Sequence, residues 1–451
     1  MKTKTFVVSI LVTLAILVAA CAPTATPTPA ATTQAPTTAV PTTAVPTTSG
    51  TTAPTTAAAT CPLPPEAGAT LTYSGWSSTT AEDQVNRDAI TRFQSVCPGI
   101  TINYVPIPTN YETKMKAEMA GGTAADVFYV NTNILTDFAP TGQLLPLDSL
   151  MSQAGVKLSD FIPALTAEFV QGGKTYGLPK DWSTLGLVYL PAAFTAAGIP
   201  EPTNSWTYTD LVNAAKTIAT KTNYAGFCMA ADAVRLWPWV ASNGGDYTTP
   251  DYKTATLDTT QVTDAATMVA QMKTDGSLKT PTDLSVSWCG EGIGKGAAAM
   301  TLEGTWMISY MQTTYPNVVY KAVLPPSGSA GQADMTFTNA LGVNASTKYP
   351  NAAADFVFYY TGLANTLAVQ ATGFAFSPHP EAIAQATDPI AKAMLPGGTL
   401  PLTKPEYWGP YTGALETVVS NALNRVFLNQ QTVAQSFAQA VTEGDAALAG
   451  Q

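Results

Sequence analysis

Eight tryptophans are the most informative side chains of this 451-residue chain, because several of them follow predicted strands. Trp76 comes directly after one predicted strand, and Trp306 closely follows another. Three more candidates lie near turn sequences: Trp182, Trp237 and Trp408. Open α/β sheets bind ligands at the carboxyl ends of their strands, where an indole ring offers a flat stacking surface. Partly buried packing is the competing role for each ring.

Amide and carboxyl groups near the same turns add hydrogen-bonding capacity. The candidates are Asn131, Asn133, Asp181, Asn243 with its neighbour Gly244, and Glu303. Planar amides and carboxylates accept and donate paired hydrogen bonds, so with aromatic platforms they suit a neutral polyol such as a sugar. A cationic ligand would instead require a cage of carboxylates, and an anion would require arginines. A solvated loop charge is the commoner role for any single carboxylate.

Composition excludes several classes of function. Only 12% of residues are charged and the formal net charge is -10, which disfavours nucleic acid and anionic headgroups as partners. The single histidine, His379, lies between two prolines, and an HExxH zinc enzyme or a metal site with several histidine ligands requires more than one imidazole group. We therefore expect no metal, no cofactor and no catalytic residue.

The N-terminal region has the layout of an export signal and a tether. Lys2 and Lys4 precede an apolar run that ends in Val-Ala-Ala before Cys21, which resembles a bacterial lipobox with Cys21 as the lipidated residue. An ordinary signal peptide is the alternative. Residues 22–60 contain 16 Thr, 7 Pro and no charge, which is typical of a disordered spacer. We expect a signal at 1–20 and a linker at 21–65.

Four further cysteines can form disulfides in an exported chain. They are Cys61, Cys97, Cys228 and Cys289, which allow three pairings. We favour Cys61 with Cys97 and Cys228 with Cys289, because a strand and its returning helix bring the first pair to one sheet edge. Buried free thiols remain the alternative.

Strand and helix patterns alternate along the rest of the chain. Strands are predicted at 69–75, 100–105, 126–130, 185–190, 225–230, 297–302, 318–324 and 337–343. Helices are predicted after the near capping box at 80–83, at about 111–120 and 208–220, and throughout about 406–448. This alternation predicts a mainly parallel α/β sheet.

Several segments, in order, resemble the extracellular solute-binding proteins of ABC importers, specifically their large sugar-binding branch. They are DVFYVN (126–131), GQLLPLD (142–148), GKTYGLP (173–179), TLGLVY (184–189), WTYTDL (206–211), GAAAMTLEGTW (296–306) and QTVAQSF (431–437). The resemblance covers about residues 69–448. In place of an acidic and a basic residue found in maltose-binding relatives, this chain has Asn133 and Ile134, which argues against maltose itself.

The resemblance implies a two-lobed type II periplasmic-binding-protein fold with a hinge and an interlobe cleft. Lobe 1 would hold 66–190 and 337–375, and lobe 2 would hold 191–336 and 376–451. It implies a monomeric receptor at the extracytoplasmic face of the membrane that binds a neutral carbohydrate and delivers it to the transmembrane subunits of a permease. Trp306 and Trp76 become the principal stacking candidates, while Trp206 and Trp288 are assigned to packing.

Two other classes of function compete with this hypothesis. A glycoside hydrolase would use two carboxylates, but no eightfold βα repeat is found. An adhesin or structural lipoprotein would use the tether for display and needs no cleft. Within the binding-protein class, a peptide, polyamine or ion could replace the sugar.

Overall fold

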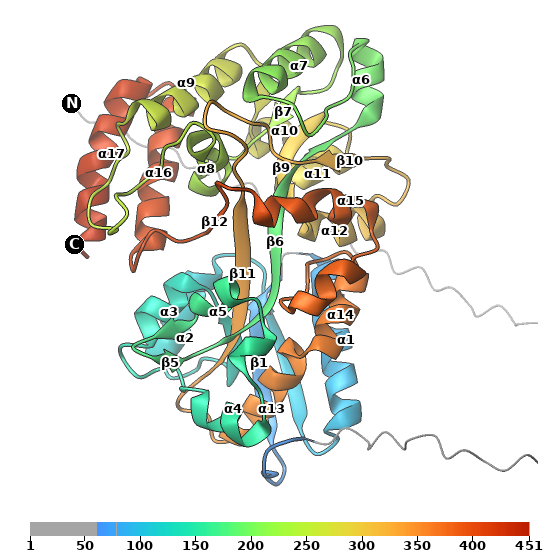
Figure 1. Ribbon diagram of the computed structural model, residues 1–451, viewed down its shortest axis with the longest axis vertical. Coiled ribbons are helices and arrows are strands. Elements are labelled where there is room, and N and C mark those ends of the chain that lie inside the picture. Colours follow the sequence, from blue (N-terminus) through green and yellow to red (C-terminus); the bar gives the residue numbers. More distant parts are fainter. Residues whose placement is uncertain (1–60, 78, 451) are drawn as a thin grey trace, which may run out of the picture. The chain divides into compact units, whose positions relative to one another are not determined.

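Two long antiparallel strands run through both halves of the protein and join them. The computed structural model describes residues 61–77 and 79–450. β6 (Leu178–Tyr189) and β11 (Met335–Val343) stand side by side at the centre of Figure 1. The eight principal strands follow the order β2-β1-β3-β11-β6-β9-β7-β8, and all 12 residues of β6 are buried. The predicted signal at 1–20, Cys21 and most of the predicted linker lie outside the described residues.

The first lobe is built around strands on one side of this central pair. β1 (Thr70–Trp76) pairs in parallel with β2 (Thr101–Ile107) and β3 (Val127–Val130), and β3 pairs antiparallel with β11. A short hairpin adds β4 (Val170–Gln171) and β5 (Lys174–Thr175). The helical elements are α1 (Thr80–Val96), α2 (Tyr111–Ala120), α3 (Thr132–Phe138), α4 (Asp148–Ala154), η1 (Leu158–Asp160), α5 (Pro163–Ala167), α13 (Pro350–Thr361) and α14 (Leu363–Ala371).

The second lobe continues the sheet on the other side. β9 (Met300–Gly304) and β10 (Lys321–Val323) pair antiparallel with β6, while β7 (Phe227–Cys228) pairs in parallel with β9 and β8 (Leu278–Lys279). Its helices include α6 (Pro191–Ala197), α7 (Tyr208–Lys221), α8 (Ala233–Ala241), α9 (Thr260–Thr274), α10 (Pro281–Leu284), α11 (Cys289–Gly294) and α12 (Trp306–Thr314). The remaining elements are α15 (Pro389–Met394), η3 (Leu395–Thr399), β12 (Lys404–Pro405), α16 (Thr412–Phe427) and α17 (Val433–Leu448). The short helix η2 (Pro380–Gln385) packs against α14 of the first lobe.

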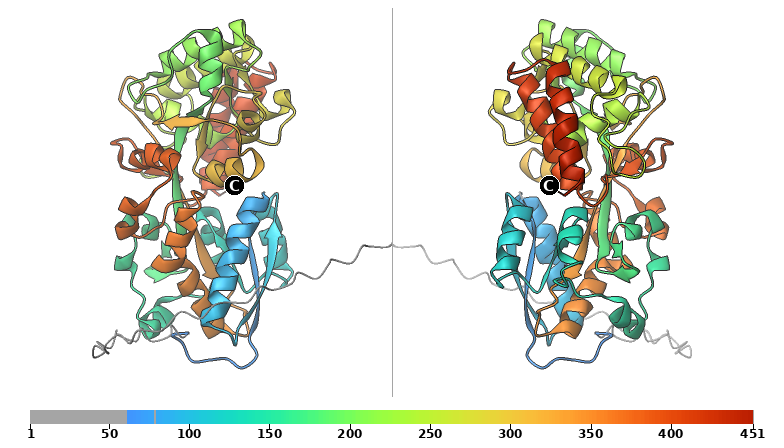
Figure 2. Two further views of the ribbon diagram at one scale, coloured as in Figure 1. Left: turned by 90° about the vertical axis from the view of Figure 1, so that its right-hand side faces the viewer. Right: turned by 90° about the vertical axis from the view of Figure 1, so that its left-hand side faces the viewer.

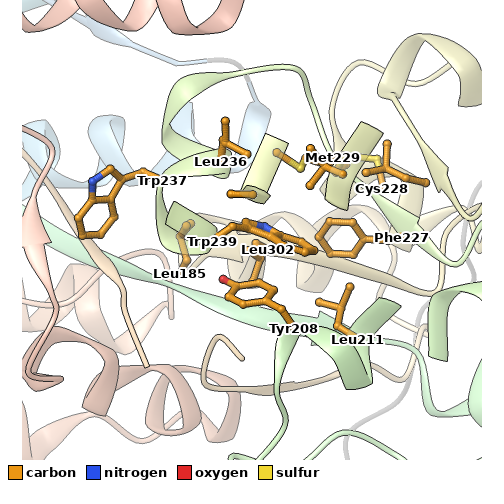
Figure 3. Packing of buried hydrophobic residues seen from close by; sticks show 14 of the residues in the cluster. Leu185, Tyr208, Leu211, Phe227, Cys228, Met229, Leu236, Trp237, Trp239 and Leu302 are labelled. Atoms are coloured by element: carbon orange, nitrogen blue, oxygen red, sulfur yellow. A yellow bond between two sulfur atoms is a disulfide. The ribbon is translucent and has the colours of Figure 1, made fainter. Parts of the chain in front are cut away.

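Each lobe has its own hydrophobic core. The first core draws on residues between 63 and 178 and between 340 and 360, and the second on residues between 185 and 448. In the second core, Trp239 stacks on Tyr208 with ring centroids 4.0 Å apart and contacts Phe227 edge-on (Figure 3). Separate cores joined by few strands allow the lobes to move as units. The two-lobed α/β fold predicted from the sequence is confirmed, but the sheet is mixed and not mainly parallel, because β6 and β11 pair antiparallel with each other and with β9 and β3.

The start of β6 differs from the sequence-based prediction. The strand was expected at 185–190, with Asp181 and Trp182 in a loop, but it begins at Leu178. Pro179 pairs with Ala340 and Asp181 with Asn339, so Lys180 is an extra residue that forms a β-bulge. Proline is tolerated at such an irregularity because its missing N–H breaks no regular ladder.

The C-terminal region also differs from the prediction, because it is not helical throughout 406–448. Residues 406–411 form a loop after β12, since Gly409 has φ 90° and is followed by Pro410. α16 and α17 are separate helices, antiparallel neighbours in Figure 2. The chain turns between them at Asn429, which has φ 56°, and α17 begins with a capping box of Thr432 and Gln435.

Both disulfides follow the favoured pairing. Cys61 is bonded to Cys97 across the start of the first lobe, and Cys228 to Cys289 within the second. The second bond ties the end of β7 to the start of α11. Among the described residues, no helix is long and apolar enough to span a membrane.

The buried side chain of Asn86 joins several elements of the first lobe. Asn86 of α1 accepts hydrogen bonds at its side-chain oxygen from the hydroxyls of Tyr73 (2.7 Å), Tyr129 (3.1 Å) and Tyr360 (2.6 Å). The ring of Tyr129 lies 4.5 Å from the Nζ of Lys180. Asn86 thus links a helix, two strands and α13 beneath the bulge of β6.

We predict that Asn86→Ala lowers the free energy of unfolding by about 3 kcal/mol, because three buried hydroxyls lose their acceptor. Urea denaturation monitored by tyrosine and tryptophan fluorescence measures the change. Gln84→Ala, on the exposed face of the same helix, is the matched control and should change stability by less than about 0.5 kcal/mol. Equal losses for the two variants would show that the hydroxyls find other partners.

Candidate functional site

A cavity of about 600 Å³ is lined by residues of both lobes. This volume is within the range of about 300 to 1,000 Å³ found for small-molecule sites. The first lobe contributes the end of β1, the start of α2, and the β3 to α3 junction. The second lobe contributes α8, β9, the start of α12 and the loop before α16, while β6 and β11 cross behind the cavity.

Most of the sequence-predicted binding residues line this cavity. They are Trp76, Asn131, Asn133, Asp181, Trp182, Glu303 and Trp306. Four other candidates are not among the lining residues: Trp237, Asn243, Gly244 and Trp408. The structure therefore brings together candidates that are up to 230 positions apart, from Trp76 to Trp306.

Aromatic rings form walls on both sides of the cavity. Trp76, at the end of β1, is 49% exposed, which makes it an unusually open indole. Trp306 faces the cavity from the first turn of α12, close above the backbone of Gly304. Trp288 also lines the cavity, although the sequence assigned it to packing; its neighbour Cys289 is fixed by a disulfide. Trp206 packs on Phe194, with centroids 6.0 Å apart, as expected.

A buried ion pair holds the indole of Trp306. Glu303 accepts hydrogen bonds at Oε2 from the guanidinium of Arg235 (2.9 Å) and from Nε1 of Trp306 (3.0 Å). Burial raises the pKa of Glu303 more than Arg235 lowers it, whereas Glu303 raises the pKa of Arg235 despite burial. The guanidinium keeps its proton and donates directly to the carboxylate, so the pair is an ion pair. The pair orients the ring that faces the cavity.

The bulge in β6 turns two adjacent side chains into the cavity. Lys180 and Asp181 form a buried ion pair and both line the site, although neighbours in a regular strand point to opposite faces. Burial lowers the pKa of Lys180, but the charge and hydrogen bond of Asp181, together with Tyr360 and Glu82, outweigh the effect of burial, so the net shift is upward. Trp182 packs on Phe376 with centroids 4.8 Å apart and donates from Nε1 to the carbonyl of Ser377. Trp182 therefore also holds residues 376–377 against β6.

The two predicted asparagines contact an acidic residue and the opposite lobe. Asn131 caps α3 by accepting from the N–H of Ile134 (2.9 Å) and donates to Glu112 (2.6 Å). Asn133 donates to the same Glu112 oxygen (3.2 Å) and accepts from the N–H of Gly413 (2.7 Å). Gly413 lies in the first turn of α16, so the last bond joins the lobes directly.

The four candidates outside the cavity have structural partners. Trp237 and Trp408 both donate from Nε1 to Oδ1 of Asp246, at 3.0 and 2.8 Å, and both are almost fully buried. Figure 3 shows Trp237 apart from the stack around Trp239. Asn243 accepts from the N–H of Ser329 (3.0 Å) and thereby fixes a surface loop, with Gly244 in the left-handed region at φ 79°.

Most carboxyl groups of the site were missed by sequence reasoning, which predicted only Asp181 and Glu303. The cavity is lined by eight of them, Glu82, Glu112, Glu168, Asp181, Asp232, Glu303, Glu406 and Glu416, but by two cationic side chains, Lys180 and Arg235. Burial, and then the charge of Glu406, raises the pKa of Glu168 to about 9. Burial raises the pKa of Glu406 and Glu416, and each lies close enough to the other to influence its ionisation.

The arrangement is suited to binding and not to a metal. Among residues 61–77 and 79–450, no group of three or more His, Cys, Asp or Glu side chains could hold a metal ion. What the cavity offers is indole faces, amides and buried carboxyls, which stack on and hydrogen-bond to an organic ligand.

Comparisons with known proteins agree with this geometry. Residues 76–366, more than half of the chain, match the bacterial extracellular solute-binding protein family. A binding protein of Brucella abortus (strain 2308) is 27% identical over 252 residues, which cover 53% of this chain and 59% of the relative. The chain thus spans about three fifths of the length of that relative.

Solved structures share the fold. An ABC substrate-binding protein of Listeria monocytogenes, in complex with cycloalternan, is 20% identical with a TM-score of 0.77, covering 83% of this chain and 98% of its own. The GacH receptor of Streptomyces glaucescens, solved unliganded and with acarbose, is 24% identical with a TM-score of 0.74, covering 84% and 97%. The chain belongs to the bacterial extracellular solute-binding protein family, whose members are binding receptors and not enzymes, and the family places it outside the cytoplasm.

Glu168 gives the unliganded protein a predictable pH dependence. Its folded-state pKa of about 9 is above the ordinary value of 4.5, so the folded protein keeps a proton that the unfolded chain has lost. The stabilising contribution is complete below about pH 4.5 and is lost as the pH rises towards 9. We predict that Glu168→Gln reduces the decline in melting temperature between about pH 5 and pH 9, because glutamine does not titrate.

Scanning fluorimetry across this pH range measures the effect. Glu381→Gln is the control, since Glu381 is exposed on η2 and does not line the cavity. An identical pH slope for Glu168→Gln and the parent protein would refute the assignment.

Proposed function

We propose that this protein is the substrate-binding lipoprotein of an ABC importer, and that it captures a carbohydrate between its lobes and delivers it to membrane permease subunits. The observation that carries the proposal is the interlobe cavity with indole rings on both sides, Trp76 from the first lobe and Trp306 from the second. Sugar rings present flat C–H faces edged by hydroxyl groups, which indoles and planar amides or carboxyls complement.

The composition of the cavity supports this ligand class. Neighbours of the same fold were solved with cycloalternan and with acarbose. Trp76, Trp182, Trp288 and Trp306 supply apolar faces, while Asn131, Asn133, Asp181 and Glu303 supply hydrogen-bonding groups. Asn133 and Glu303 are already engaged, so a ligand would share these partners or displace them.

Closure of the lobes provides the signal that a permease can detect. Ligand that contacts both lobes stabilises the closed form, because only there does it reach both walls. The direct bond from Gly413 to Asn133 shows that the lobes meet at one side of the cavity. The receptor needs differential affinity for the closed form and no chemical reaction.

A thermal-shift screen of the purified protein with neutral mono- and oligosaccharides tests the proposal. We expect at least one sugar to raise the melting temperature in a concentration-dependent way. Small-angle scattering on a variant without residues 21–60 should then show a smaller radius with that sugar. No stabilisation by any carbohydrate, or turnover of the stabilising sugar, would contradict the proposed function.

Trp306 is predicted to be a principal stacking platform. Trp306→Ala should weaken sugar binding by about 2 to 4 kcal/mol, as expected for a hot-spot aromatic, and calorimetry measures the loss. Trp206→Ala is the matched control: this indole packs outside the cavity, so the change should lower the melting temperature and leave affinity nearly unchanged. If Trp306→Ala lowers the melting temperature alone, the ring serves the core.

Cys21 is proposed as the lipid anchor, with the Thr- and Pro-rich residues after it as a spacer from the membrane. The small residues before Cys21 and the uncharged tract after it motivate the proposal. Cys21→Ala should release the protein from the membrane fraction into the soluble exported fraction. Retention of the variant in the membrane fraction would exclude lipidation of Cys21 as the anchor.

A further inference from the structure

Four glutamates from the two lobes surround one part of the cavity. Glu112 and Glu168 belong to the first lobe, and Glu406 and Glu416 to the second. Glu406 influences the ionisation of both Glu168 and Glu416, and Glu112 influences that of Glu406 and Glu416. Carboxyl groups from opposite lobes therefore lie within electrostatic reach of one another.

The cations of the cavity compensate this group only in part, because the charge of Arg235 lowers the pKa of Glu406 by less than burial raises it. Lys180 is paired with Asp181, and Arg235 with Glu303. Among the described residues, the amides of Asn131 and Asn133 are the partners of Glu112.

Buried oxygens show that the group is incomplete. Among the residues that the structure describes, Oε1 of Glu168 and Oε1 of Glu416 are buried and have no hydrogen-bond partner. The carboxyl groups of Glu416 and Glu406 hydrogen-bond to each other, so Glu168 is the member of the group that most clearly lacks a donor. Both Glu168 and Glu416 line the cavity. A buried acceptor without a donor costs about 1 to 3 kcal/mol, and more when it is charged. A donor supplied by the ligand would remove this cost.

An ammonium group has the chemistry that these carboxyls lack. It brings one positive charge and up to three N–H donors, which suits several acceptors placed around one point. The indoles on the cavity walls also attract cations. A sugar hydroxyl supplies one donor and no charge, so it would leave the excess of carboxyl groups uncompensated. The described residues offer no metal-binding cluster as an alternative.

We propose that the solute of this receptor is a carbohydrate that carries a protonated amine, held between Glu112 and Glu168 of one lobe and Glu406 and Glu416 of the other. The inference rests on the proposed function and specifies its ligand class. The amine replaces repulsion between the lobes by attraction, so it favours the closed form as well as binding.

Paired ligands test the inference without any mutation. The probes are glucosamine, galactosamine, mannosamine and the β-1,4-linked glucosamine dimer and trimer, each beside the sugar with a hydroxyl group in place of the amine and its N-acetyl form. Calorimetry near pH 7 should show at least one amine bound about tenfold or more tightly than both of its uncharged counterparts, as expected for hydrogen bonds to charged groups.

Substitutions of the carboxyl groups test which of them cause the preference for the amine. Glu406→Gln combined with Glu416→Gln keeps the shape but replaces two ionisable carboxyl groups by neutral amides, and should abolish most of the preference for the amine. Glu381→Gln on the exposed surface is the matched control and should keep the full preference. Circular dichroism establishes whether each variant is folded. If the double variant does not fold, the comparison of ligands on the parent protein still tests the inference.

The outcomes separate this inference from the proposed function. If uncharged sugars bind as tightly as their amine partners, or more tightly, the inference is wrong and the carbohydrate receptor stands. If spermidine or putrescine binds and no sugar does, the carbohydrate function is wrong. An amine preference that survives the double substitution would overturn the assigned carboxyls, and no binding by any probe would overturn both proposals.

Discussion

Pairing between β6 and β11 is the interaction on which the rest of the structure depends. The first half of β6 hydrogen-bonds to β11, and its second half to β9, so one strand belongs to both lobes. β11 also belongs to both lobes, because it begins beside β12 and ends beside β3 of the first lobe. Because the shared strands cannot part without breaking the ladder, the lobes stay joined while they bend. The cavity lies in front of these two strands, where side chains from both lobes converge.

An irregularity in the same strand builds part of the site. The bulge at Lys180 breaks the alternation of side chains, so Lys180 and Asp181 both reach the cavity as an ion pair. The Asn86 and tyrosine network beneath them keeps Tyr129 close to Lys180. The bulge, the buried hydrogen bonds of Asn86 and the Lys180–Asp181 ion pair are therefore connected through Tyr129. We expect a substitution of Asn86 to change the surroundings of Lys180.

Within the cavity, hydrogen bonding between the lobes favours closure, whereas repulsion between carboxyl groups opposes it. Asn133 and Gly413 join the lobes through a hydrogen bond, while Glu112 and Glu168 face Glu406 and Glu416 across the same cavity. Burial, and then the charge of Glu406, raises the pKa of Glu168, and the proton that Glu168 therefore holds limits this repulsion. A solute that compensates the carboxyl groups would therefore favour the closed form, which would make the lobes sensitive to the charge of the solute.

The sequence by itself determined eight of the strands, the helices α1, α2 and α7, the favoured disulfide pairing, the family resemblance and the candidacy of Trp76 and Trp306. These features follow from periodicity, turn residues and motif order, which are local properties of the chain. Tertiary structure alone decided that Trp306 lies at the cavity beside Glu303 whereas Trp237 and Trp408 are buried against Asp246, although all three indoles donate to a carboxylate. It also decided the bulge at Lys180 and the meeting of Glu168, Glu406 and Glu416. The direction of a side chain and its distance from residues hundreds of positions away depend on strand register and lobe packing, which no local pattern records.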